Sequence, residues 1–192
     1  TFWVEQATVH NINDLSAVLK VLEKEPQACI VRGTPKTETQ SPTRRLIEHF
    51  DDIPLHTVLV EIDSYVPLIN DPLTEPQGAA LEYITEHLPS AFHNTSFHWQ
   101  LSNSAGAPGN ETKLKAHLWF YLKTPYNSAT LRAWAKVEDL QLDRSVLQVC
   151  QVHYTSLPIF SPGVIDPITQ RSGLCRRAQD SVDLVIDTDS LN

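Results

Sequence analysis

The sequence contains no methionine, only three cysteines and only six glycines among its 192 residues. The cysteines are Cys29, Cys150 and Cys175, and none belongs to a C-x-x-C pair, which argues against a zinc knuckle or a dithiol redox centre. Three isolated thiols are typical of a reducing compartment, so we expect a cytoplasmic protein. Because methionine is missing even at position 1, we expect the chain to be a piece of a longer protein.

Long apolar runs are also missing. No stretch approaches the roughly 20 uninterrupted apolar residues that a membrane helix needs, and no basic start followed by an apolar run marks a secretory signal. We therefore expect no membrane partner. What is present is the composition of a folded chain, with 41% hydrophobic and 20% charged residues, which excludes disorder throughout.

Positive charge is scarce overall but concentrated in one segment. The net charge is −8, yet residues 101–177 hold nine Lys and Arg against five Asp and Glu. Residues 1–100 are strongly acidic, with 14 acidic against six basic residues, and the last fifteen add four aspartates and no base. A basic segment beside an acidic half could bind a phosphate ligand without holding nucleic acid tightly.

Periodicity predicts a mixture of helices and strands without regular β-α-β alternation, which favours an α+β fold over a doubly wound sheet. A segment at 143–149 could be a helical turn or a strand, and 153–178 is expected to be mostly irregular. Helices are predicted at 13–25 (capped by Asn13 or Asp14), 79–88 and 128–136, and strands at 28–32, 57–63, 96–101, 114–122 and 182–186.

Two acids one residue apart, Glu61 and Asp63, end the apolar run at 57–63. Residues two apart on a strand point to the same face, so both carboxylates should project together. A divalent cation that prefers oxygen, Mg²⁺ or Mn²⁺, would relieve their repulsion. The alternative is that Glu61 merely caps the strand end and that Asp63 starts a turn.

A second candidate site lies on the strand at 114–122. Lys113, Lys115 and His117 share one face, and two ammonium groups beside an imidazole suit an anionic substrate such as a triphosphate. The preceding loop contains Ser102, Ser104 and Gly106, which could offer hydroxyls and backbone N–H groups to phosphates. A solvent-facing histidine and an ordinary hairpin connection are the alternatives.

Asp143 and an arginine cluster are the remaining candidates. Asp143 could be a third carboxylate for two metal ions, or it could be a helix N-cap before Ser145. Arg171, Arg176 and Arg177 could meet nucleotide or template phosphates, or they could belong to a solvated loop.

In order and context these motifs resemble the archaeo-eukaryotic primase superfamily, the primase-polymerases of plasmids, phages and integrated elements. The first motif of this superfamily is a pair of acids one residue apart, which Glu61 and Asp63 match. The second is a serine- or glycine-rich loop that leads to a histidine on a strand, and residues 102–117 match it. The third is a hydrophobic residue followed by Asp, matched by Leu142-Asp143. The segment 146–174 extends the likeness, which covers about residues 28–186. Glu61 stands where many members have Asp. Asp139 is an alternative to Asp143 as the aspartate of the third motif.

The resemblance implies a two-part catalytic core, with an α/β part at about 1–56, a distorted RNA-recognition-like sheet at 57–186 flanked by helices, and an acidic tail at 187–192. It implies a DNA primase or polymerase that serves the replication of a mobile element. Such an enzyme makes or extends primers on single-stranded DNA from NTPs or dNTPs. Its implied partner is a fused or associated helicase. The implied ligands of two Mg²⁺ or Mn²⁺ ions are Glu61, Asp63 and Asp143. The implied nucleotide-binding residues are His117, Lys113, Lys115, Ser102, Ser104, Gly106, Arg171 and Arg176.

Two alternatives use the same residues differently. A non-catalytic module related to the primases would bind nucleic acid or a replication partner, as the acidic first half and Glu61 suggest. A metal-dependent phosphoesterase would use the same acids together with histidines.

Overall fold

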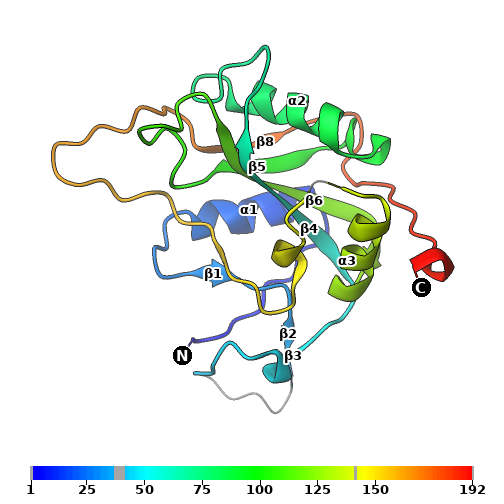
Figure 1. The fold of residues 1–192 in the computed structure, drawn as a ribbon. Coiled ribbons are helices and arrows are strands. Elements are labelled where there is room, and N and C mark those ends of the chain that lie inside the picture. The colour runs from blue at the N-terminus through cyan, green and yellow to red at the C-terminus, as the bar shows by residue number, and fades with distance from the viewer. Residues whose placement is uncertain (1, 37–41, 141, 192) are drawn as a thin grey trace.

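The computed structural model describes residues 2–36, 42–140 and 142–191 and has an α+β fold (Figure 1). Its centre is a four-stranded antiparallel sheet with strand order β4-β6-β5-β8. Two short antiparallel pairs, β1 with β7 and β2 with β3, lie outside this sheet. The strands are β1 (Cys29–Ile30), β2 (Thr34–Pro35), β3 (Phe50–Asp51), β4 (Leu55–Tyr65), β5 (Phe97–Leu101), β6 (Leu114–Tyr126), β7 (His153–Tyr154) and β8 (Ser172–Cys175).

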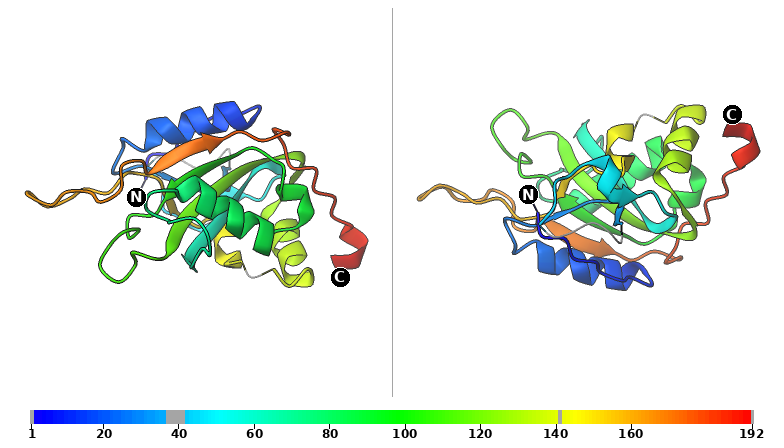
Figure 2. Two further views of the ribbon diagram at one scale, coloured as in Figure 1. Left: turned by 90° about the horizontal axis from the view of Figure 1, so that it is seen from above. Right: turned by 90° about the horizontal axis from the view of Figure 1, so that it is seen from below.

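Helices α1 (Ile12–Leu22) and α2 (Pro76–His87) cover opposite faces of the main sheet (Figure 2). His98 and Trp99 are neighbours on β5 and therefore point to opposite faces. The His98 ring is hydrogen-bonded to Ser16 on α1, whereas the Trp99 indole donates to Gln77 on α2. Both faces of β5 are consequently buried.

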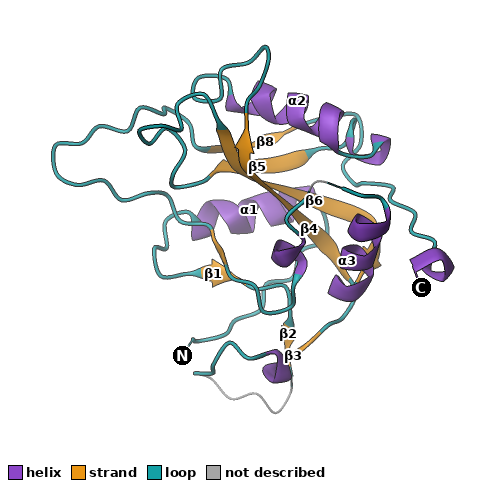
Figure 3. Ribbon diagram, in the orientation of Figure 1, coloured by secondary structure: helices purple, strands orange, loops and turns teal. Residues whose placement is uncertain are grey.

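The third helix, α3 (Ser128–Val137), begins just after β6 (Figure 3). Asn127 caps it by accepting a hydrogen bond from the Thr130 N–H, and Asp52 accepts two more from the first turn. Four short 3₁₀ helices complete the structure: η1 (Ile47–His49), η2 (Ser90–Phe92), η3 (Arg144–Leu147) and η4 (Thr188–Leu191). Within the described ranges, no helix has the length and apolar character to cross a bilayer.

The three predicted helices and four of the five predicted strands are present, with shifted ends. Helix α1 starts at Ile12 because Asn11, rather than Asn13 or Asp14, is the N-cap. The predicted strand at 182–186 is wrong. Val182 forms only an isolated bridge with Leu122. The alternating apolar side chains of this segment are buried in the core, but its backbone does not pair continuously with a strand.

Sequence patterns missed β8, which falls in the segment expected to be irregular. Its sequence, Ser-Gly-Leu-Cys, lacks β-branched residues, and the strand forms because the edge of β5 offers hydrogen bonds. Gly173 packs closely there, since a Cβ atom would lie 3.0 Å from the indole nitrogen of Trp99. The predicted ambiguity at 143–149 is resolved as the 3₁₀ helix η3.

Candidate functional site

Three neighbouring strands bring Glu61, His117 and Gln100 side by side. Glu61 on β4 pairs in register with His117 on β6, and His117 pairs with Gln100 on β5. All three line a pocket of about 240 Å³, and His117 Nε2 lies 3.6 Å from Glu61 Oε1. The pocket thus joins a carboxylate, an imidazole and an amide on one face of the sheet.

His153 forms part of the pocket wall, together with Gln151 and Tyr154. Its ring is 5% exposed, and Nε2 donates a hydrogen bond to the Val146 carbonyl at 3.0 Å. Burial, with a smaller effect of the nearby His117, lowers the pKa of His153 to about 4. His153 therefore contributes a neutral imidazole.

Asp63 projects from the same strand as Glu61 but does not line the pocket. Its side chain is 87% exposed, and Oδ1 accepts a hydrogen bond from Lys115 Nζ at 2.6 Å. Lys115, expected to face an anionic substrate, is thus paired with Asp63, and neither side chain lines the pocket.

The serine- and glycine-containing loop reaches the pocket only at its start. Ser102 lines the pocket, and its hydroxyl lies 3.2 Å from that of Ser104, which is outside the pocket lining. Gly106 has a φ of +75°, and a Cβ atom there would meet Pro167 and Ile168 at 3.2 Å. The structure gives Gly106 a role in loop packing, and Lys113 lies outside the pocket lining.

Arg171 is engaged within the protein. Its side chain is 5% exposed and forms a bidentate pair with Asp166, at 2.6 and 2.8 Å. It also donates to the carbonyls of Ser102 and Ala105, so it holds the start of the pocket loop in place. Arg176 is exposed, is paired with Asp180 at 3.3 Å, and does not line the pocket.

Asp143 is the N-cap of η3, which is the alternative role considered above. Its carboxylate accepts hydrogen bonds from the backbone N–H and the hydroxyl of Ser145, both at 2.8 Å. It lines a second hollow next to α3 and is not part of the Glu61 pocket. Its rival Asp139 follows α3 with a φ of +49° and is also absent from the pocket lining.

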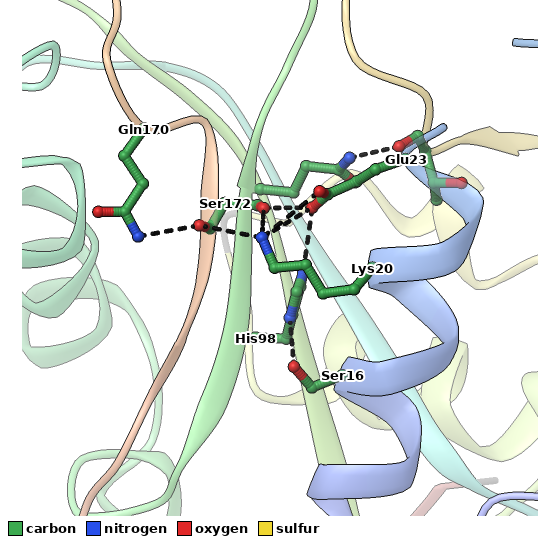
Figure 4. A network of polar contacts seen from close by, with 8 residues as sticks. Ser16, Lys20, Glu23, His98, Gln170 and Ser172 are labelled. Atoms are coloured by element: carbon green, nitrogen blue, oxygen red, sulfur yellow. Dashed lines mark hydrogen bonds and ion pairs between the residues drawn. The ribbon is translucent and has the colours of Figure 1, made fainter. Parts of the chain in front are cut away.

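A polar network lies between α1 and the strands β5 and β8 (Figure 4). Glu23, at the end of α1, accepts a hydrogen bond from Ser172 on β8, and Lys20 lies 3.3 Å from the same carboxylate. The fully buried His98 is hydrogen-bonded to Ser16 through Nδ1 at 2.9 Å, and burial lowers its pKa to about 4, with Lys20 adding to the shift.

Gln100 connects this region to the pocket wall. Its Nε2 donates to the carbonyl of Thr155, and its buried Oε1 has no hydrogen-bond partner among the described residues. Because the amide is anchored on one side, its orientation at the pocket is fixed by the protein itself.

The pocket lining contains one carboxylate, that of Glu61, and Asp63 lies two residues further along β4 outside the lining. No group of three or more His, Cys, Asp or Glu side chains placed to hold a metal is found in the described part of the chain. Glu61 and Asp63 nevertheless offer two carboxylates on one face of β4, and Mg²⁺ is commonly bound by one or two carboxylates plus substrate phosphates. The donor chemistry therefore suits an ion that arrives with a phosphorylated substrate.

Sequence reasoning did not assign a site role to Gln100, Gln151 or His153. Gln100 lies two residues before Ser102 on a fully buried strand. A polar side chain on such a strand is the signal that could have identified it as a site residue. His153 lies on the pocket wall because β7 pairs with β1, a pairing that local sequence patterns do not reveal. Comparison with known proteins matched no family model, no curated protein and no solved structure.

Proposed function

We propose that this chain catalyses template-directed nucleotidyl transfer on single-stranded DNA and acts as a primase-polymerase. The observation that supports the proposal best is the alignment of Glu61, His117 and Gln100 across three adjacent strands at one pocket. A carboxylate next to an imidazole suits a metal-bound triphosphate, since the acid contacts the ion and the imidazole contacts phosphate oxygens.

Each side chain has a distinct role in this proposal. Glu61 and Asp63 would hold a Mg²⁺ or Mn²⁺ ion, which neutralises charge on the triphosphate during transfer. His117 binds and orients the phosphates, and Ser102 adds a hydroxyl at the rim. Arg171 acts through the loop that it holds. Asp143 as the ligand of a second ion stays a prediction without support from the pocket, because its carboxylate caps η3 and lines a different hollow.

Primer extension on a single-stranded template, with Mg²⁺ or Mn²⁺ supplied, tests the proposal. Glu61→Gln and Asp63→Asn keep the size of each side chain and remove its charge, so we expect extension to fall about 100-fold or more. Glu25→Gln is the matched control, because Glu25 is exposed and does not line the pocket. Wild-type rates in both the Glu61 and the Asp63 variant would contradict the proposal.

One observation favours a second candidate, a non-catalytic module that binds nucleotide or nucleic acid. Lys115 already neutralises Asp63, which weakens the attraction of that carboxylate for a cation. Such a module would bind nucleoside triphosphate without releasing pyrophosphate. Product analysis separates it both from a polymerase and from a phosphoesterase, which would release phosphate without chain growth.

A further inference from the structure

A second hollow, of about 750 Å³, lies between α3 and η3 and presents three cationic side chains. Arg132 and Lys136 are one helical turn apart on the exposed side of α3, and Arg144 is the first residue of η3. All three are exposed, and none forms an ion pair within the described part of the chain.

The hollow has little negative charge of its own. The one carboxylate in its lining, Asp143, is engaged by the N–H and hydroxyl of Ser145. Asp187 and Asp189 lie in or next to η4, which packs on α3, but they do not line the hollow. In a chain with a net charge of −8, three cations against one carboxylate around one hollow favour an anionic ligand.

The same short helix contacts both the hollow and the Glu61 pocket. Arg144 and Ser145 line the hollow, whereas the carbonyl of Val146, the next residue, accepts the hydrogen bond of the pocket residue His153. The hollow and one residue of the Glu61 pocket thus share a supporting helix. An open surface of exposed cations holds a ligand with several phosphates better than it holds one small anion.

From these observations we propose that the hollow of Arg132, Lys136 and Arg144 binds the phosphodiester backbone of single-stranded DNA. The choice of single-stranded DNA as the ligand rests on the proposed function. Binding at the hollow, however, requires neither the nucleotide nor the metal. The contacts are to phosphates, so binding should depend on salt and not on base sequence.

Fluorescence anisotropy with a labelled oligothymidylate, measured over a series of salt concentrations without nucleotide or divalent ion, tests the inference. The triple variant Arg132→Ala, Lys136→Ala, Arg144→Ala should weaken binding at least about tenfold. It should also reduce the slope of log affinity against log salt by about 2, the value for three lost contacts to a single strand.

The matched control is Lys24→Ala, Lys123→Ala, Arg177→Ala, which removes the same net charge from exposed positions outside the hollow. We expect this control to bind close to wild type. Equal weakening in both triple variants would overturn the inference, because net charge alone would then explain binding. Unchanged binding in the hollow variant would overturn it as well.

Two further arms separate the possible outcomes. Arg132→Lys, Arg144→Lys keeps the charge and should retain most of the affinity, which excludes a folding defect as the cause. If the hollow variant loses binding of inorganic triphosphate but keeps DNA binding, the site is one for a free polyphosphate and the inference is wrong. Glu61→Gln should bind DNA normally, so wild-type extension rates in that variant would contradict the proposed function without affecting this site.

Discussion

Two histidines, His98 and His153, are buried as neutral imidazoles, and each has a pKa lowered to about 4 by burial. In the unfolded chain, a histidine takes up its proton near pH 6.5. The unfolded state therefore binds more protons between pH 6.5 and 4, so stability is complete above this window and is lost as the pH falls through it.

From this difference we expect acidification from pH 7 to pH 5 to lower the free energy of unfolding by about 2 kcal/mol per histidine. Urea denaturation at several pH values measures the effect, and His98→Gln and His153→Gln should each flatten the pH dependence. The exposed His10 provides the control His10→Gln. An unfolding free energy that stays constant over this range in the wild type would contradict the account.

At the same scale, residue patterns predicted some site members and missed others. Glu61 and His117 were identifiable because strand alternation predicts which face each side chain occupies, and their strands were strongly marked. Gln100 and His153 were not, because their roles depend on the pairing partners of β5 and β7. The pairing of distant strands is not encoded in local periodicity.

Among the elements, the loop that starts at Ser102 is held by the ion pair of the buried Arg171 with the partly exposed Asp166. Arg171 binds Asp166 in a bidentate manner and donates to two carbonyls of this loop. The guanidinium also holds the pKa of Asp166 below its usual range. Removing one partner of such a pair leaves the other charge and the two carbonyls without their hydrogen bonds.

We expect Arg171→Met to destabilise the fold by about 2–3 kcal/mol and to weaken nucleotide binding through displacement of Ser102. Thermal and urea denaturation measure the first effect, and a nucleotide titration measures the second. Arg176→Met is the control, since Arg176 is in an exposed pair with Asp180 and should cost less than about 1 kcal/mol. Similar stability losses in the two variants would contradict the role given to Arg171.

Helices, long strands and the short strand β1 were predictable as elements, whereas the short strands β2, β3, β7 and β8 and the closing segment were not. The β-branched residues of β4 and the apolar positions of α1 carry strong local signals. β8 forms against the edge of β5 in spite of its weak local preference, and Val182 is buried without forming a strand. Tertiary context decided both cases.

At the scale of the whole molecule, one hydrophobic core connects both ends of the chain. Leu19 from α1, Leu118 from β6, Leu131 from α3 and Ile186 near the C-terminus belong to one cluster of buried residues. The segments 1–56 and 57–186 that were distinguished in the sequence therefore share a core, and we expect them to unfold together.

This expectation is tested by thermal unfolding followed with two probes, tryptophan fluorescence and far-ultraviolet circular dichroism. The two transitions should coincide, because the tryptophans of β5, β6 and α3 lie in the same cluster as α1. Separate midpoints would show that α1 and the sheet are independent units. Leu19→Ala should lower the single midpoint as a whole, since it opens a cavity in the shared core.

The central claim is that the pocket of Glu61 and His117 binds a metal-bound nucleoside triphosphate. Calorimetric titration with a nucleoside triphosphate and Mn²⁺ tests it most directly, with Glu61→Gln and His117→Ala as pocket variants and Glu25→Gln and His10→Ala as controls. The account predicts saturable binding to the wild type and the controls, and binding at least about tenfold weaker in both pocket variants. Equal affinity in all five proteins, or no binding to the wild type, would contradict it.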